Sequence, residues 1–299
     1  MKLFCVVVTY NGLRWIDKCL SSLTSSTVPI CSIIVDNGST DGTKEYIAQH
    51  HKDALLLCQE KNLGFGQANN IGIRYALEHD ATHVLLLNQD AWIAPDMIEK
   101  MMPYIDEDSL VSPIHMTGEG DRLDRNFCKN ALMKSPELER LQNNWAVGVT
   151  DRYYTNEINA ACWLLPRKIL EGIGGFNPLF FHYAEDIDYL QRLHYHQKGV
   201  YFVPDARVYH DRANVPDKVP NAQLIYQQLI LRAVDIRRSR FGCLMLRWRY
   251  AIGVFHTAFT AHRWKDIVYY FHALARYHTM HRSIRDNRNT LKTIGRHWL

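Results

Sequence analysis

The chain has 299 residues, of which 47% are hydrophobic, and its 35 Lys and Arg against 31 Asp and Glu leave a net charge of +4. This length suits one α/β domain with an appendage, at the hydrophobic fraction of an ordinary globular protein. The seven cysteines show no CxxC spacing, which argues against a zinc site or a disulfide framework and for reduced thiols in a cytosolic protein.

Strand-like and helical segments alternate through the first half of the chain. The β-branched and apolar runs that predict strands are Leu3–Thr9, Ser32–Asp36, Ala54–Gln59, His83–Asn88 and Leu110–Pro113. The segments that predict helices between them are Arg14–Ser22, Thr43–His51, Gly66–His79 and Pro95–Tyr104. This alternation is typical of βαβ units, so we expect an α/β fold with a mainly parallel central sheet.

The second predicted strand ends at Asp36, and the turn after it is rich in Gly, Asn, Asp and Ser. In open α/β sheets the ligand crevice lies outside the carboxyl ends of the strands. A carboxylate at this position suits a ribose or a base, and the backbone N–H groups of the turn suit phosphates.

The loop from Asn62 to Asn70 places Gly64 and Gly66 directly after the third predicted strand. Glycines at the start of a helix let the backbone approach a phosphate or a sugar closely. A dinucleotide fingerprint would need a third glycine at Asn69 and would follow the first strand, so an NAD(P)-dependent oxidoreductase is disfavoured.

The apolar strand that ends at Leu87 is followed at once by Asn88, Gln89 and Asp90. A carboxylate buried without a partner would be costly, so we expect Asp90 at a crevice, where a hard divalent cation is a natural ligand. An ordinary turn aspartate explains Asp90 by itself equally well.

Residues 117–156 interrupt the alternation, because they are polar and weakly periodic, and we expect an irregular excursion or flap. Apolar character returns at Ile158–Leu165, and a helix at Glu185–Lys198 and a strand at Val200–Val203 follow.

The composition changes beyond Arg212, where Pro216 and Pro220 indicate a linker. We therefore divide the chain into a domain of residues 1–215 and a helical extension of residues 216–299.

Three acids open the predicted helix, namely Glu185, Asp186 and Asp188, directly after an aromatic run that includes Phe181 and Tyr183. The helix dipole favours acids in a first turn, so stability alone can explain them. The aromatic run favours a second explanation, in which a carboxylate in a low-dielectric environment acts as a general base beside a sugar. His210 suits either a metal ligand or a packed residue.

The extension is strongly basic. Residues 221–299 hold 14 Lys and Arg against 3 Asp and Glu, a net charge of +11, whereas the rest of the chain holds 21 against 28, a net charge of −7. Basic residues interleaved with aromatics such as Trp248 and Trp264 suit peripheral contact with an anionic membrane. Packing on the catalytic domain or a homodimer interface is the alternative, and the acidic body disfavours nucleic acid.

Two further features bear on localisation. The longest uncharged stretch of the extension, Tyr250 to Ala261, is shorter than the roughly 20 apolar residues that a membrane-spanning helix needs. The chain runs from Met1 directly into a strand, so we expect no signal peptide and a cytoplasmic protein.

The order of these motifs resembles the family 2 glycosyltransferases over roughly residues 3–212. The residues that carry the resemblance are Val7–Asn11, Val35–Thr43, Asn88–Asp90, Gly174–Phe176 with Glu185–Asp186, and His210. The segment from Ala161 to Arg192 is similar to the acceptor side of bacterial rhamnosyl- and galactosyltransferase-like members.

The resemblance implies a GT-A (Rossmann-like) fold and an inverting glycosyltransferase. It implies transfer from a UDP-sugar or dTDP-rhamnose to a hydroxyl of a saccharide or lipid-linked acceptor, in cell-surface polysaccharide synthesis. The enzyme would act in the cytoplasm, with peripheral contact at the inner face of the cell membrane.

The resemblance also implies roles for individual residues. The nucleotide contacts would be Thr9, Tyr10, Asn11, Asp36, Asn37, Gly66, Asn69, Asn88 and Gln89. Asp90, with His210 as second ligand, would hold Mg²⁺ or Mn²⁺. Asp186 would be the catalytic base, with Glu185 and Asp188 as alternatives, and the acceptor sugar would contact Trp163, Phe181 and Tyr183.

One residue departs from the family pattern, because Asn88 stands where the metal-binding DxD motif has its first acid. This departure leaves open a catalytically silent scaffold or sensor that binds a nucleotide sugar.

Overall fold

The computed structural model describes residues 1–211 and 222–299. The strands within these ranges are β1 (Leu3–Thr9), β2 (Cys31–Asp36), β3 (Leu55–Cys58), β4 (His83–Asn88), β5 (Ala91–Ile93), β6 (Ser109–Thr117), β7 (Tyr153–Tyr154), β8 (Cys162–Pro166) and β9 (Gly199–His210).

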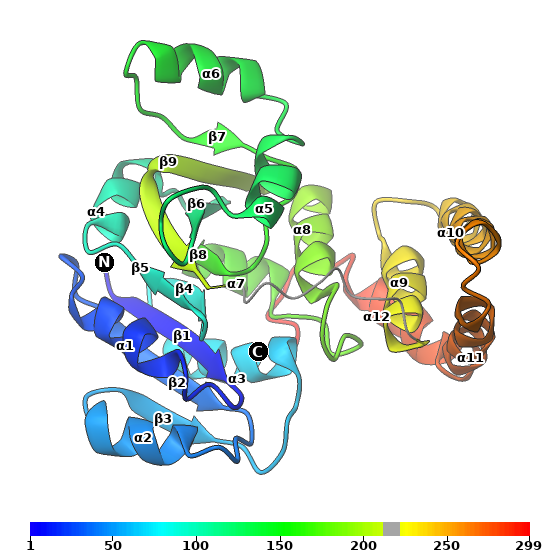
Figure 1. The fold of residues 1–299 in the computed structure, drawn as a ribbon, viewed down its shortest axis with the longest axis horizontal. Coiled ribbons are helices and arrows are strands. Elements are labelled where there is room, and N and C mark those ends of the chain that lie inside the picture. Colours follow the sequence, from blue (N-terminus) through cyan, green and yellow to red (C-terminus); the bar gives the residue numbers. More distant parts are fainter. Residues whose placement is uncertain (212–221) are drawn as a thin grey trace.

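Helices connect and cover these strands (Figure 1). They are α1 (Ile16–Thr24), α2 (Thr43–His50), α3 (Phe65–Glu78), α4 (Met97–Met101), α5 (Arg125–Phe127), α6 (Leu138–Ala146), α7 (Arg167–Ile173), α8 (Glu185–Tyr195), α9 (Ala222–Val234), α10 (Arg240–Thr260), α11 (Lys265–Thr279) and α12 (His281–Thr290). A 3₁₀ turn, η1 (Met102–Tyr104), follows α4, and a π-helical turn, η2 (Cys128–Leu132), follows α5.

The strands form one sheet in the order β3-β2-β1-β4-β8-β6-β9-β5, with β7 paired to β9. The first four strands in this order are mutually parallel, as the alternation of strands and helices predicts. Strand β8 runs antiparallel to β4 and β6, and β5 runs antiparallel to β9. The sheet is therefore mixed beyond β4, although β6 and β9 run parallel to each other.

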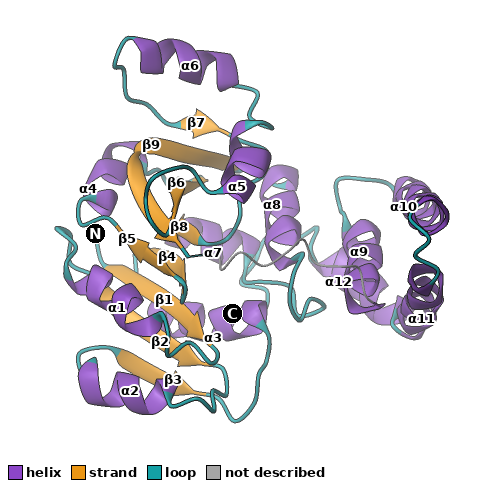
Figure 2. Ribbon diagram, in the orientation of Figure 1, coloured by secondary structure: helices purple, strands orange, loops and turns teal. Residues whose placement is uncertain are grey.

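Helices cover both faces of the sheet (Figure 2). Along β1, Cys5 and Val7 pack against α1 and α4, whereas Phe4 and Val6 pack in the cluster that contains α3, α7 and α8. Alternate residues of a strand point to opposite faces, so a strand buried on both faces must be apolar throughout. This requirement explains the continuous apolar runs of β1 and β4.

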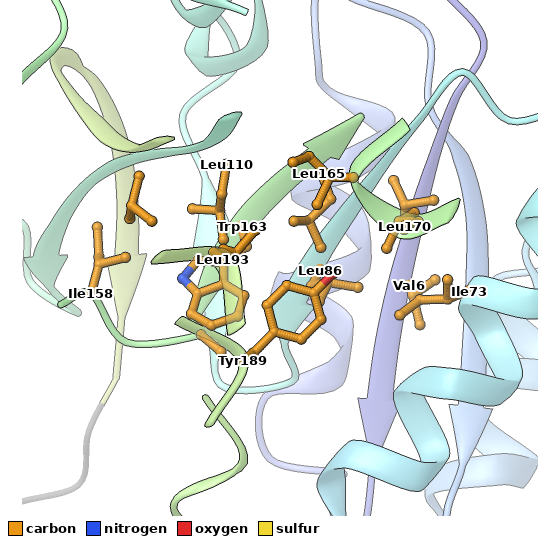
Figure 3. Close-up of a cluster of buried hydrophobic side chains, with 14 of the residues drawn as sticks. Val6, Ile73, Leu86, Leu110, Ile158, Trp163, Leu165, Leu170, Tyr189 and Leu193 are labelled. Carbon is orange, nitrogen blue, oxygen red and sulfur yellow. The ribbon is translucent and has the colours of Figure 1, made fainter. Parts of the chain in front are cut away.

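Trp163 belongs to this core rather than to an acceptor site (Figure 3). Its side chain has no exposed surface, and its ring lies 6.2 Å from that of Phe176 and 5.8 Å from that of Tyr189, measured between centroids. The predicted contact between Trp163 and an acceptor sugar is therefore wrong. The residue sits on β8 at a position that faces the helix α8, and the tight packing there leaves no room for a ligand.

Strand β9 continues to His210, well beyond its predicted end at Val203. The pairing register between β6 and β9 shifts after Val203, and residues 204–206 have no partner in the β6 register. This bulge absorbs Pro204, which has no N–H to donate, and the strand resumes beyond it.

The segment 117–156 is more ordered than its polarity predicts. It contains α5, η2 and α6, and β7 pairs with β9 through Tyr153 and Tyr154. The prediction of an irregular excursion is therefore wrong for these short helices and this strand. They form because a few buried side chains, such as Phe127 and Leu141, anchor them to the core.

Helices α9–α12 form a lobe beside α8, away from the sheet (Figure 1). Phe180 and Ala184, which precede α8, pack into the core of this lobe. The chain then returns to the sheet domain, where the carbonyl of His297 accepts a hydrogen bond from the N–H of Gly175 at 2.8 Å. The predicted boundary at 215/216, with Pro216 and Pro220, lies outside the described residues.

Across residues 1–211 and 222–299, every helix is too short or too polar to cross a lipid bilayer.

Replacement of Trp163 by Ala is expected to lower the free energy of unfolding by about 3–5 kcal/mol, because a large buried ring is lost and a cavity remains. Urea denaturation measures this change. The matched control is Trp145→Ala on α6, where the ring is 67% exposed and the expected change is within about 0.5 kcal/mol. A loss below about 1 kcal/mol at position 163 would contradict the packing described here.

Candidate functional site

A cavity of about 690 Å³ opens where the carboxyl ends of β1, β2 and β4 meet the N-terminus of α8. This volume is in the range of small-molecule and cofactor sites. The cavity is lined by ten of the residues predicted from the sequence, namely Tyr10, Asn37, Asn88, Gln89, Asp90, Phe181, Tyr183, Glu185, Asp186 and His210. In particular, Asp90 and Asp186 face the same cavity although they lie on different elements.

Asp90 and His210 meet because β5 pairs with the end of β9. Ala91 lies opposite His210 in the antiparallel ladder, and the N–H of Asp211 donates to the carbonyl of Asp90 at 2.9 Å. This pairing sets Nε2 of His210 3.2 Å from Oδ1 of Asp90. The imidazole is almost fully buried, whereas the Asp90 side chain is 28% exposed toward the cavity.

A carboxylate oxygen and an imidazole nitrogen together are donors that fit a divalent cation such as Mn²⁺. Within the described residues, no group of three or more His, Cys, Asp and Glu side chains could hold a metal by itself. Asp90 and His210 therefore fit a cation whose remaining ligands are oxygens of a bound substrate or water.

Asn88 and Gln89 lie at the carboxyl end of β4, and both line the cavity. Oε1 of Gln89 accepts hydrogen bonds from the hydroxyl of Thr9 at 2.7 Å and from the N–H of Tyr10 at 2.9 Å. Gln89 thereby ties the end of β1 to the end of β4. Oδ1 of Asn88 is buried at the cavity wall and has no hydrogen-bond partner in the protein. A buried acceptor of this kind is costly unless a ligand donor satisfies it.

The turn after β2 forms the opposite wall. Asp36 is buried, and one of its carboxylate oxygens accepts from the N–H of Ser39 at 3.1 Å. The side chain of Asn37 donates to Asn62 at 3.0 Å and accepts from the N–H of Leu63 at 2.8 Å. These bonds hold the turn against the loop that begins α3.

Five other predicted nucleotide contacts are not among the residues that line this cavity, and these are Thr9, Asn11, Asp36, Gly66 and Asn69. They hold the wall in place: the side chain of Asn11 accepts from the N–H of Thr40 at 2.9 Å, and that of Asn69 donates to the carbonyl of Phe65 at 3.0 Å. Direct contact with a nucleotide stays a prediction for these five residues, as it does for Tyr10, Asn37, Asn88 and Gln89.

Gly64 allows the α3 loop to approach the segment before α8. Its φ is +86°, and a Cβ at this position would lie 2.0 Å from the carbonyl oxygen of Phe181. That oxygen accepts a hydrogen bond from the N–H of Phe65 at 3.2 Å. Any other residue at position 64 would push the two loops apart, so the glycine is required by a close backbone approach rather than by a phosphate.

The turn into α8 is strained. Tyr183 and Ala184 have φ values of 70° and 74°, in the left-handed region that non-glycine residues rarely adopt. Such strain persists only where the surroundings enforce it, and it is concentrated at functional sites. Here it leaves Phe181 and Tyr183 exposed on the cavity wall, 46% and 38% respectively.

Glu185 and Asp186 follow this turn and both line the cavity. Asp186 is half-buried, and its Oδ1 accepts from the N–H of Ile187 at 2.8 Å. Burial, followed by the neighbouring charge of Asp186, raises the pKa of Glu185 to about 8. Near neutral pH the Glu185 carboxyl is therefore mainly protonated.

Asp188 is wrong as a candidate base, because it does not reach the cavity. Its carboxylate is fully buried and accepts from Nε of Arg192 at 3.0 Å. The same guanidinium donates to the carbonyls of Ile173 and Gly175, each at 2.8 Å. Two residues past Asp186, the α8 helix therefore carries a structural ion pair instead of a catalytic group.

Four polar lining residues were missed by the sequence analysis, namely Asn62, Asn126, Asn159 and His182. Asn126 and Asn159 come from the segment 117–160, where no periodicity or motif distinguishes them from other polar residues. Only the packing of that segment over the sheet edge brings their side chains to the cavity.

A second cavity of about 360 Å³ lies between α6 and strands β6 and β9. The described residues that line it are apolar except for the amide of Gln142, so it offers no group for acid–base or metal chemistry.

Comparison with known proteins gives a family match. The model of the family "Glycosyl transferase family 2" matches residues 4–172. The chain is 26% identical over 268 residues to the N-acetylglucosaminyl-diphospho-decaprenol L-rhamnosyltransferase of Mycobacterium tuberculosis, covering 81% of this chain and 87% of that protein. It is 26% identical over 242 residues to the dTDP-rhamnosyl transferase RfbF of Shigella flexneri, covering 79% and 78%.

Among solved structures, the mannosyltransferase PcManGT from Pyrobaculum calidifontis, in complex with GDP-Man and Mn²⁺, shares the fold. The TM-score is 0.57 at 16% identity, and the match covers 97% of this chain and 86% of that one. A likeness at this identity bears on the fold alone, and it agrees with a GT-A-like arrangement of sheet and helices.

The stability of the protein is expected to depend on the protonation of Glu185. The pKa of Glu185 is raised from 4.5 to about 8 in the folded state, so the charged form of its carboxyl opposes folding. The stability that is present below about pH 4.5 is therefore lost as the pH rises toward 8. Glu185→Gln removes this loss. Relative to wild type, the free energy of unfolding of the variant should rise by up to about 1.4 kcal/mol for each pH unit across that window.

Urea denaturation of both proteins between about pH 5 and pH 8 measures the effect. Glu139→Gln, at an exposed position of α6, is the matched control and should show no such trend. A constant difference between Glu185→Gln and wild type over this range would mean that Glu185 has an ordinary pKa.

Proposed function

This chain belongs to glycosyl transferase family 2, and on that premise we propose that it is an inverting enzyme that moves a sugar from a nucleoside-diphosphate donor to a hydroxyl of a saccharide acceptor. The observation that carries the proposal is a single cavity lined both by the Asp90–His210 pair and by Asp186. A cation site facing a diphosphate and a base facing an alcohol are the two groups that such a transfer needs.

The proposed donor is dTDP-rhamnose or a UDP-sugar. The relatives from Mycobacterium tuberculosis and Shigella flexneri are both named rhamnosyltransferases, which supports rhamnose as the transferred sugar. The proposed acceptor is a lipid-linked saccharide of cell-surface glycan synthesis, in keeping with the decaprenol-linked sugar in the name of the first relative.

In the proposed reaction, Asp186 takes the proton of the acceptor hydroxyl as its oxygen forms a bond to the anomeric carbon. The bond from that carbon to the diphosphate oxygen breaks, and the electron pair leaves with the nucleoside diphosphate. Glu185, protonated near neutral pH, adds no second negative charge beside the base. Attack from the face opposite the leaving group inverts the anomeric centre.

A divalent cation held by Asp90 and His210, Mg²⁺ or Mn²⁺, would neutralise charge on the departing diphosphate. Asn88, in place of an acid, keeps an oxygen at the wall without adding negative charge. Phe181 and Tyr183, exposed on the cavity wall, offer aromatic faces for the acceptor sugar, and Tyr10 and Asn37 line the nucleotide side.

Asp186→Asn is expected to bind the donor normally but to lower the transfer rate by about 100-fold or more, because general-base catalysis is lost while the side-chain shape is kept. Release of the nucleoside diphosphate measures transfer, and calorimetry measures donor binding. Asp53→Asn, an exposed substitution away from the cavity, is the control. Near-normal turnover of Asp186→Asn would refute the base assignment.

Wild-type protein that binds the donor, yet neither transfers nor hydrolyses it with either cation, would instead support a catalytically silent scaffold or sensor.

Removal of divalent cations with EDTA is expected to abolish transfer, and added Mn²⁺ or Mg²⁺ should restore it. Asp90→Asn should raise the cation concentration for half-maximal activity by roughly tenfold or more, because the carboxylate ligand is lost. Titration of Mn²⁺ by electron paramagnetic resonance, with nucleoside diphosphate present, reads cation binding without turnover. Full activity in EDTA would contradict a metal-dependent mechanism.

A further inference from the structure

Helix α10 exposes a stripe of large apolar side chains. The stripe consists of Phe241, Met245, Trp248, Ile252 and Phe259, which are between 47% and 70% exposed. Their spacings of four, three, four and seven residues place them on one face of the helix. Single exposed apolar residues are ordinary, but an aligned row of this length is not.

Trp264, directly before α11, and Val268 and Phe271 on α11 extend this surface, each between 52% and 55% exposed. The rings of Phe259 and Trp264 lie 4.9 Å apart, measured between centroids, at the point where α10 passes into α11. The stripes of the two helices therefore adjoin, and together they are called here the α10–α11 face. The two helices that carry it lie at the end of the molecule farthest from the sheet, where they are seen end-on in Figure 1.

The side of α10 that packs on the rest of the lobe combines small residues with the partly buried side chains of Tyr250 and Val254. The buried positions of this helix are Cys243, Ala251 and Ala258. Folding alone would place large apolar side chains inward, because burying them stabilises the protein. Five large apolar side chains of this helix nevertheless stay outside the core, which indicates that the outer face meets an apolar partner.

The same surface is electropositive. Between residues 240 and 279 the basic residues are Arg240, Arg247, Arg249, Arg263, Lys265 and Arg276. The single acid in this range is Asp266, which is buried and paired with Arg263 at 3.0 Å. Arg240, Arg249 and Lys265 are exposed beside the apolar stripe.

We propose that the α10–α11 face docks on an anionic lipid bilayer. The apolar and aromatic side chains would enter the boundary between headgroups and acyl chains, and the arginines and lysine would contact the anionic headgroups. A second copy of the chain fits this face less well. A two-fold interface brings the same patch against itself, so the exposed basic residues would oppose one another without an exposed acid from this region to pair with them.

The docking lobe is connected to the catalytic helix by polar contacts. The side chain of Asn287 on α12 accepts from and donates to Asn177, each at 2.9 Å, and Asn177 also donates to Asp188 at 3.3 Å. Asp188 lies on α8, one residue beyond Ile187 and two beyond Asp186. The membrane contact therefore holds the cavity at a defined orientation to the bilayer, although the docking itself does not depend on the proposed transfer reaction.

Flotation of the full chain with vesicles tests the proposal. Wild-type protein should float with vesicles of phosphatidylcholine mixed with phosphatidylglycerol at low salt, and weakly or not at all with phosphatidylcholine alone. Trp248→Ser combined with Ile252→Ser should weaken binding to the anionic vesicles by roughly tenfold or more. These side chains are exposed, so the circular dichroism and the unfolding midpoint should stay unchanged.

Two matched substitutions complete the test. Arg240→Gln combined with Arg249→Gln should weaken binding roughly tenfold or more, because each basic residue near an anionic surface adds to the electrostatic attraction. The salt dependence of binding should also become flatter, because salt screens this attraction. Trp145→Ser, which removes an equally exposed indole from α6, should bind like wild type.

Absence of flotation of the wild-type protein with anionic vesicles at low salt would overturn the proposal. So would a wild-type dimer in sedimentation velocity that Trp248→Ser with Ile252→Ser converts to a monomer, since the face would then be an interface between copies. Transfer to a water-soluble acceptor is measured in parallel. Flotation without transfer would reject the proposed function alone, whereas transfer without flotation would reject the docking alone.

Discussion

The antiparallel pairing of β5 with the end of β9 is the interaction on which the candidate site depends. It places Ala91 opposite His210 and so brings Asp90, 120 residues away in the chain, within 3.2 Å of the imidazole. The pairing is possible only because the bulge after Val203 absorbs Pro204 and lets β9 continue. A strand that stopped at the proline would leave β5 without a partner and Asp90 without its histidine.

The second wall of the cavity depends on how α8 is anchored. Arg192 binds Asp188 and two backbone carbonyls in the interior, and this places the helix so that its first residues, Glu185 and Asp186, reach the cavity. Removing a partner from a buried ion pair leaves an uncompensated charge, so the anchor and the helix position are strongly coupled. The C-terminal lobe contributes to the same anchor through Asn287, so a segment outside the sheet domain bears directly on the orientation of the base.

Hydrophobic periodicity predicts much of the fold because it reports burial, and burial on both faces of a strand leaves an unmistakable apolar run. The runs at Leu3–Thr9 and His83–Asn88 are β1 and β4 at the same bounds. Periodicity fails where the neighbouring elements, rather than the residues of the segment itself, determine its structure. The pair Tyr153–Tyr154 is a strand because β9 passes beside it, and Trp163 is a core residue because α8 covers it.

By itself, the sequence determined the strand ends that carry chemistry: Asp36 and Asp90 after apolar runs, Asp186 at a helix start, and a basic, aromatic C-terminal extension. Each is a local pattern that the sequence shows directly. A polar residue next to a buried apolar run is costly to bury, so it lies at an edge of the sheet or at a helix end. The tertiary structure alone decided which of these residues meet. It separated Asp186 from Asp188, joined Asp90 to His210, brought Asn126 and Asn159 to the cavity, and turned the rings of α10 outward. Contacts between residues far apart in the chain are set by packing and strand register, and neither can be predicted from a single segment of the sequence.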